Sequence, residues 1–142
     1  MFSIELIQDR PPIGRGRIRI GGFQEEFEVS LEHWSGQDYE RQWLQALEGL
    51  LSGGEKTALI ASMTDPQTAN FLFWWPAYAD GEDVVFQNGV LFMDELTGPF
   101  DPSRCDEFVL PREQVSETGD RISEWRAPAA DVRQFIASAR RP

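Results

Sequence analysis

A pair of glycines, Gly21-Gly22, constrains the fold of this chain more than any other feature of its sequence. Strand-like runs lie on both sides, over residues 15–20 and 23–33, and adjacent glycines readily adopt the positive φ angles of a tight two-residue turn. The sequence therefore predicts a β-hairpin. Its register places Ile20 opposite Phe23, Arg17 opposite Glu26 and Arg15 opposite Glu28.

The second strand of this hairpin alternates between apolar and polar residues. Its apolar positions are Phe23, Phe27, Val29 and Leu31, and Glu25 is the one exception to the alternation. A period of two predicts one buried and one solvated face. On the solvated face we expect arginine–glutamate pairs across the strands, each contributing about 0.2–1 kcal/mol. Glu32 lies beyond the reach of these arginines.

A capped helix is predicted directly after the hairpin. Ser35 and Asp38 have the spacing of a capping box, in which each side chain accepts a hydrogen bond from the other residue's backbone N–H. Ser52-Gly53-Gly54 provides a stop signal. Between them an apolar stripe recurs at helical spacing, as expected for a helix with one buried face; it consists of Tyr39, Trp43, Ala46, Leu47 and Leu50.

The remaining patterns predict an α+β fold: an antiparallel β-sheet with about two helices packed against it, in a single domain over residues 1–142. Further strands are expected at residues 2–7, 56–63, 70–79 and 84–93, the second of them in the centre of the sheet. Short sheet segments are expected at 108–110 and 122–125. A last helix is expected to begin at Pro128 and to extend to Ala139.

The most apolar stretch, residues 70–79 (NFLFWWPAYA), leaves alternatives open. Trp74 and Trp75 would point to opposite faces of a strand: either both are covered by the core, which the composition favours, or one is exposed and anchors a partner. Pro76 predicts an edge strand or a bulge. Asn88-Gly89 fits a second tight hairpin or a bulge in one long strand that pairs with residues 71–79.

The charge of the chain is strongly negative and unevenly distributed. The net charge is −11, and residues 21–110 contain seventeen acidic and three basic residues. Such a field repels nucleic acid and anionic membranes, steers a basic partner towards the protein, and also favours solubility. No secretory signal or long apolar run is present. We therefore expect a cytoplasmic protein that binds neither nucleic acid nor membrane.

Acidic residues in turns and loops are the candidates for binding a partner. Two groups bracket one predicted strand, and a further residue ends the hairpin. These candidates are Glu32, Asp80, Glu82, Asp83, Asp94 and Glu95. They have few basic neighbours along the chain, unlike the glutamates of the hairpin, although solvated turns are the alternative interpretation.

No motif for catalysis or cofactor binding is visible. The chain lacks a phosphate-binding glycine loop, a nucleophile elbow and a paired-histidine metal motif. Its lone cysteine, Cys105, excludes an internal disulfide, and with the lone histidine, His33, it cannot build the usual zinc sites, so neither metal nor cofactor is expected. A Cys105/His33 pair or a carboxylate-dependent hydrolase remains an alternative.

Three segments resemble one family of immunity proteins from bacterial contact-dependent growth inhibition systems. They are YERQWLQAL at 39–47, Gln87-Asn88 followed by Leu91-Phe92, and Ile122-Ser123-Glu124-Trp125. The resemblance spans residues 14–135. It implies a small, non-enzymatic, cytoplasmic protein that binds and neutralises the C-terminal toxin domain delivered by a neighbouring cell.

The resemblance also implies that the toxin is often a nuclease. An acidic inhibitor suits a basic nuclease site, because its carboxylates can stand where phosphates would bind. No site residue carries over from the family, since the shared segments indicate structure. The alternative is a secretion adaptor or chaperone, which would bind its partner without abolishing the partner's activity.

Overall fold

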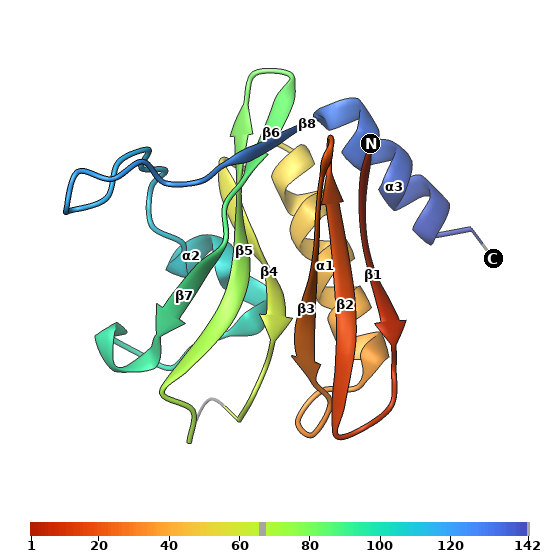
Figure 1. Ribbon diagram of the computed structural model, residues 1–142, viewed down its shortest axis with the longest axis vertical. Helices are drawn as coiled ribbons and strands as arrows, with labels where there is room; N and C mark the ends of the chain where they lie inside the picture. Colours follow the sequence, from red (N-terminus) through yellow and green to blue (C-terminus); the bar gives the residue numbers. More distant parts are fainter. Residues whose placement is uncertain (66–67, 142) are drawn as a thin grey trace.

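The structure, a computed structural model, describes residues 1–65 and 68–141. Over these residues the chain forms two antiparallel sheets, with α1 (Gly36–Leu51) and α3 (Ala129–Ala139) as its longer helices (Figure 1). The predicted α+β class is confirmed. The strands, however, divide between an N-terminal sheet and a second sheet instead of forming one.

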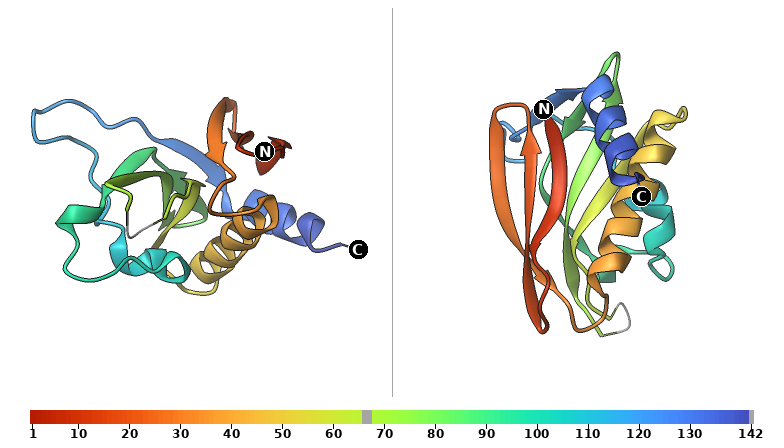
Figure 2. Two further views of the ribbon diagram at one scale, coloured as in Figure 1. Left: turned by 90° about the horizontal axis from the view of Figure 1, so that it is seen from below. Right: turned by 90° about the vertical axis from the view of Figure 1, so that its right-hand side faces the viewer.

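The strands of both sheets follow a simple order. The N-terminal sheet has the order β1-β2-β3, and the second sheet has the order β4-β5-β6-β8, with β7 also paired to β5. Helices α1 and α3 run on one side of the molecule (Figure 2). The strands are β1 (Phe2–Gln8), β2 (Ile13–Ile20), β3 (Phe23–Ser30), β4 (Lys56–Ser62), β5 (Phe71–Asp80), β6 (Asp83–Phe86), β7 (Gly89–Phe92) and β8 (Trp125–Pro128). The short helices are η1 (Met93–Glu95), η2 (Pro102–Arg104) and α2 (Cys105–Phe108).

The predicted hairpin and its register are confirmed. Gly21 has a φ of 60°, and β2 pairs with β3 in the expected register. Arg17 lies 3.9 Å from Glu26, but Arg15 reaches diagonally to Glu26 at 3.2 Å instead of pairing with Glu28. Within the described residues, Glu28 therefore has no salt bridge.

Helix α1 begins at the predicted capping box. The Ser35 hydroxyl accepts a hydrogen bond from the Asp38 N–H at 3.3 Å, and the Asp38 carboxylate accepts one from the Ser35 N–H at 2.9 Å. The second bond stabilises the carboxylate and lowers the pKa of Asp38. The predicted stripe is buried at Tyr39, Trp43, Leu47 and Leu50 and half-buried at Ala46.

Polar groups on the buried face of α1 hold the helix against β4. The Trp43 indole N–H donates to the Ile60 carbonyl at 2.8 Å. The Gln42 amide donates to the Ala58 carbonyl and accepts from the Ile60 N–H, both at 2.9 Å. Because these bonds are directional, they set the position of the helix along the strand as well as its distance from it.

Tyr39 connects the ends of strands from both sheets. Its hydroxyl donates to the Ser30 carbonyl at 2.6 Å and accepts from the Met63 N–H at 2.7 Å. Burial raises the pKa of Tyr39 to about 12. Tyr39, Gln42 and Trp43 are called the helix clamp below.

The strand predicted at residues 56–63 is present as β4, but the prediction that this strand lies in the centre of its sheet is wrong. Among the described strands, β4 pairs with β5 alone and so ends the sheet. Residues 57–61 are nevertheless all buried, because α1 covers the strand and β3 approaches it. At that approach the Ser30 N–H donates to the Ser62 hydroxyl at 3.1 Å.

Strand β5 crosses the middle of the second sheet, and both tryptophans on it are buried. Trp74 lies against Phe100 and Trp75 against Phe27, with ring centroids 6.3 Å and 6.1 Å apart. The core alternative is therefore confirmed. The large exposed residues of β5 are Phe71 and Phe73.

Pro76 marks an interruption in the sheet. Both β6 and β7 pair with β5, and between them Gln87 and Asn88 lie opposite Pro76 and Trp75. Proline has no N–H to donate, so the ladder breaks at this point, although the Gln87 N–H still donates to the Pro76 carbonyl at 2.9 Å. β6 and β7 pair with β5 in one continuous register, as expected for a single long strand, but neither side has an extra residue. The predicted bulge, the edge strand at Pro76 and the hairpin at Asn88-Gly89 are therefore all wrong.

The C-terminal third differs most from the expectation. Phe108 ends the short helix α2, so a sheet segment at 108–110 is wrong, and β8 begins at Trp125 where the predicted segment ended. Helix α3 starts at Ala129, with Pro128 as its N-cap. A pattern of three or four residues is too short to determine where a strand begins. The start of β8 depends instead on its pairing with β6, which is distant in sequence.

The helix clamp generates a stability prediction. Tyr39→Phe keeps the ring but leaves the Met63 N–H and the Ser30 carbonyl without their partner, so it should lower the free energy of unfolding by about 1–3 kcal/mol. Tyr78→Phe is the matched control, because it removes a single bond, to the Leu110 carbonyl. Urea unfolding measures the free energy of unfolding of both variants. An equal loss of stability in the two would contradict the larger contribution of the Tyr39 hydroxyl.

Candidate functional site

The six candidate acids lie in three places. Asp80, Glu82 and Asp83 form the turn between β5 and β6, Asp94 and Glu95 lie in η1 after β7, and Glu32 follows β3. Figure 1 shows the ends of β3 and β7 at one end of the molecule and the β5–β6 turn at the other. The structure therefore does not gather the candidates into one cluster.

Arginines from the C-terminal part of the chain neutralise most of the β5–β6 turn. Arg126 lies 2.8 Å from Asp80 and 3.2 Å from Asp83, and Arg112 lies 3.4 Å from Asp80. The hydrogen bond from Arg126 lowers the pKa of Asp80. The prediction that the candidate acids lack basic partners is therefore wrong for Asp80 and Asp83, because the partners come from residues distant in sequence.

Arg112 also belongs to a more buried network. It donates to both carboxylate oxygens of Glu124, at 2.8 Å and 2.7 Å, and the Gln87 amide donates to the same carboxylate at 2.8 Å. These bonds, with the one from Arg112 contributing most, lower the pKa of Glu124 to about 2. The network fastens the base of the projecting segment 110–124 (Figure 2) to the break between β6 and β7.

The other four candidates are free carboxylates. Glu32, Glu82, Asp94 and Glu95 are exposed, and none makes a salt bridge within the described part of the chain. Three of them lie at the end of the molecule where β3 and β7 finish (Figure 1). That end keeps its negative charge available to a partner.

An apolar surface near that end was not predicted from the sequence. Phe71, Phe73, Val90 and Phe92 are each at least 40% exposed on β5 and β7. A groove of about 560 Å³ lies between two of them, Phe73 and Val90, and β3. The alternation of Phe71 and Phe73 with buried Leu72 and Trp74 was visible in the sequence. Period two identifies residues that share a face, but it does not tell whether another element covers that face.

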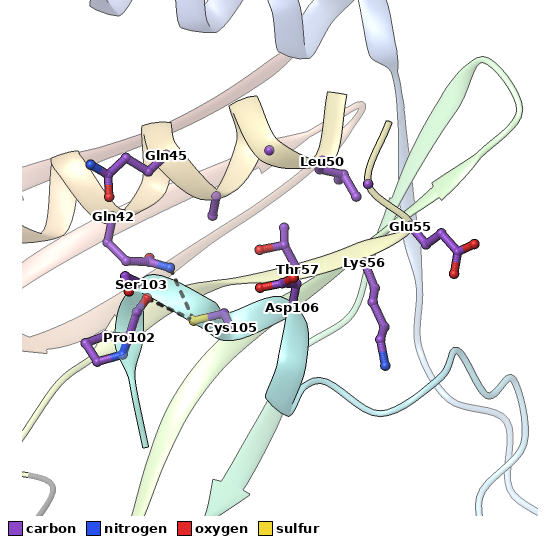
Figure 3. A pocket seen from close by; sticks show the side chains of 13 residues that line it. Gln42, Gln45, Leu50, Glu55, Lys56, Thr57, Pro102, Ser103, Cys105 and Asp106 are labelled. Carbon is purple, nitrogen blue, oxygen red and sulfur yellow. Dashed lines mark hydrogen bonds between the residues drawn. The ribbon is translucent and has the colours of Figure 1, made fainter. Parts of the chain in front are cut away.

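A second cavity, of about 370 Å³, lies beside α1 and β4 and includes Cys105 (Figure 3). The thiol donates to the Pro102 carbonyl at 3.4 Å and accepts from the Gln42 amide at 3.5 Å. Burial raises the pKa of Cys105 to about 12, so the sulfur is protonated and a poor nucleophile. His33 is exposed in the turn before α1 and is not among the hydrogen-bond partners of Cys105, so the geometry does not support a Cys105/His33 pair.

Two further observations concern the described residues as a whole. Over residues 1–65 and 68–141, no group of three or more His, Cys, Asp or Glu side chains is arranged to hold a metal ion. No helix in the same ranges is both long enough and apolar enough to cross a bilayer.

The Glu124 network generates a pH-dependent prediction. Glu124→Gln should lower the free energy of unfolding at pH 7 by about 1–3 kcal/mol, because Arg112 loses an anionic partner. The folded-state pKa of about 2 lies below the ordinary 4.5, so the stabilisation is complete above pH 4.5 and disappears as the pH falls through 2. Urea unfolding at pH 7 and pH 3 should therefore show a smaller difference between variant and wild type at pH 3.

Glu117→Gln is the control for this experiment. Glu117 is exposed on the same projecting segment, so its substitution should change stability little at either pH. A loss for Glu124→Gln that stays the same at both pH values would contradict the charge-based origin of the effect.

Comparison with known proteins identifies the family. The model of the family described as CdiI N-terminal domain matches residues 29–135. A relative from Enterobacter cloacae subsp. cloacae, immunity protein CdiI, is 36% identical over 121 residues, which cover 85% of this chain and 83% of the relative.

A solved structure agrees with this match. It is described as a CdiA-CT/CdiI toxin and immunity complex from Enterobacter cloacae, and the matching chain has a TM-score of 0.86 and 33% identity over 97% of both chains. These findings confirm the resemblance seen in the three sequence segments. The chain belongs to the CdiI family of immunity proteins.

Proposed function

We propose that this protein binds the C-terminal toxin domain of a cognate CdiA protein in the cytoplasm and neutralises it. The observation that carries the proposal is the match over 97% of the chain to a protein solved within a toxin and immunity complex. The immunity proteins of such complexes are toxin inhibitors and not enzymes, so the hydrolase alternative is rejected. One continuous core that joins both sheets and the helices supports the proposal that residues 1–142 act as one domain.

We further propose that the toxin is a nuclease and that an acidic surface of this protein meets its basic active site. The net charge of −11 supports this, because carboxylates can take the positions of phosphates and a negative field accelerates encounter with a basic partner. Direct cover of the active site would exclude the nucleic-acid substrate by sterics and by charge.

The free carboxylates are the strongest toxin-binding candidates within this proposal. Glu32, Asp94 and Glu95 follow β3 and β7 at one end of the molecule, and Glu82 belongs to the β5–β6 turn at the other end (Figure 1). Asp80 and Asp83 remain candidates for toxin binding, but they are weaker candidates because Arg126 already neutralises them. Their reversal to lysine would place a cation beside Arg126 and destabilise the turn, so it would not test binding cleanly.

The proposal is tested by protection and inhibition together. Cells that express the C-terminal domain encoded by the adjacent upstream gene should stop growing, and co-expression of this protein should restore growth. In vitro, an equimolar amount should abolish cleavage of RNA or DNA by that domain. A tight complex in which the toxin stays fully active would contradict neutralisation and support the adaptor alternative.

A charge variant tests the acidic end. The double variant Asp94→Lys/Glu95→Lys should lower the affinity for the toxin domain about tenfold at low salt, and it should reduce the salt dependence of binding, because rim charges act through screened attraction. The control Glu40→Lys/Glu117→Lys makes the same change in net charge at exposed positions elsewhere. Equal weakening in both variants would show that net charge, and not these two residues, is what matters.

A further inference from the structure

Four exposed apolar side chains form a continuous surface on β5 and β7. Phe71 lies directly opposite Phe92 in the antiparallel register, and Phe73 lies directly opposite Val90. Directly opposite residues project from the same face of a sheet. The four are 45%, 47%, 51% and 40% exposed in that order and are called the phenylalanine patch.

The patch is the uncovered continuation of a core face. Residues alternate along a strand, so Phe71, Phe73 and Trp75 lie on the same face of β5. At Trp75 this face is covered by β3, whose Phe23 and Phe27 rings lie 6.5 Å and 6.1 Å from the indole. Beyond Trp75 the cover stops, and Phe71 packs against Phe73 and Phe92 at 5.4 Å and 6.4 Å.

A groove with negative charge borders the patch. It occupies about 560 Å³ and has Glu25, Phe27 and Glu28 of β3 on one side, and Phe73 and Val90 of the patch on the other. The described residues that line it include no lysine, arginine or histidine. Apolar walls with carboxylates at their edge suit a partner segment that combines an apolar side chain with cationic neighbours.

Glu25 gives this groove its distinctive character. It is the one polar residue on the apolar face of β3, it is half-buried, and within the described residues it makes neither a salt bridge nor a side-chain hydrogen bond. A carboxylate of this kind loses part of its hydration without gaining a partner. A cation placed in the groove would supply the missing partner.

We propose that the phenylalanine patch and its groove form the docking surface for a segment of the toxin domain that presents an apolar side chain flanked by lysine or arginine. This inference rests on the proposed function and adds the surface and the chemistry of the contact. Asp94 and Glu95 directly follow the patch, so the free acids at that end of the molecule extend the same surface and attract the same cations.

Other occupants fit the charges less well. A second copy of this chain would place Glu25, Glu28, Asp94 and Glu95 opposite like charges, which opposes association. Bases could stack on phenylalanine rings, but the phosphates of a nucleic acid would meet the same carboxylates. An anionic membrane surface is repelled for the same reason.

The test measures binding of the purified toxin domain to the full-length protein by titration calorimetry. Phe73→Ser and Phe92→Ser should each lower the affinity at least about tenfold, as expected for aromatic anchors at the centre of an interface. Glu25→Lys should lower it and reduce its dependence on salt. Ile13→Ser is the control for the loss of an exposed apolar residue, since Ile13 is 57% exposed on β2, and it should leave the affinity within about twofold, as expected outside an interface.

The possible outcomes separate this inference from the proposed function. Wild-type protein that neither binds nor protects would overturn both. Wild-type protein that protects, with patch variants that bind as tightly as wild type, would overturn the docking surface alone. A wild-type dimer that the patch variants convert to monomer, with toxin binding unchanged, would assign the patch to self-association and also overturn it. Circular dichroism of each variant confirms the fold, and Glu25→Lys tests the groove without removing an aromatic ring.

Discussion

The hydroxyl of Tyr39 holds together parts of the molecule that share no strand pairing. It accepts from the backbone after β4 and donates to the backbone at the end of β3, while Gln42 and Trp43 fix the same helix along β4. Buried hydrogen bonds of this kind are costly to leave unmade. One face of α1 therefore helps to hold the N-terminal sheet against the second sheet, in addition to the direct contacts between the sheets.

The groove beside the phenylalanine patch follows from how β3 is held. At its start, Phe23 stacks on Trp125 with ring centroids 4.0 Å apart, and at its end the Ser30 N–H bonds to Ser62. Glu25 and Glu28 lie between these two attachments, where no backbone ladder joins β3 to its neighbours in the second sheet. Because β3 has no backbone hydrogen bonds to β5 or β7 in this region, a groove stays open between β3 and the second sheet.

Local patterns in the sequence were sufficient to predict the parts of the fold that depend on near neighbours. The Gly21-Gly22 turn, the Ser35/Asp38 cap and the stripe of α1 each depend on residues that are close together in the sequence. The division into two sheets and the place of β4 at a sheet end depend on contacts between distant residues, which period and propensity do not encode.

The same distinction applies to the candidate site. Composition and turn signals identified exposed acids, and four of the six are free. They could not show that Arg126, more than forty residues downstream of Asp80, neutralises that turn. The phenylalanine patch was missed because the sequence of β5 does not state how far β3 extends over it. Glu25 was recognised as an exception to the alternation, and its position beside the groove now gives that exception a physical context.

The location of the phenylalanine patch outside the helix clamp has a consequence for divergence among proteins of this kind. Substitutions at Phe71, Phe73, Val90 or Phe92 change side chains that are about half-exposed, whereas the clamp residues are buried. A descendant can therefore alter the proposed docking surface in single steps at a smaller cost in stability than a change in the helix clamp would have. Related inhibitors can therefore diverge in the toxin that they recognise while the fold of the inhibitor stays the same.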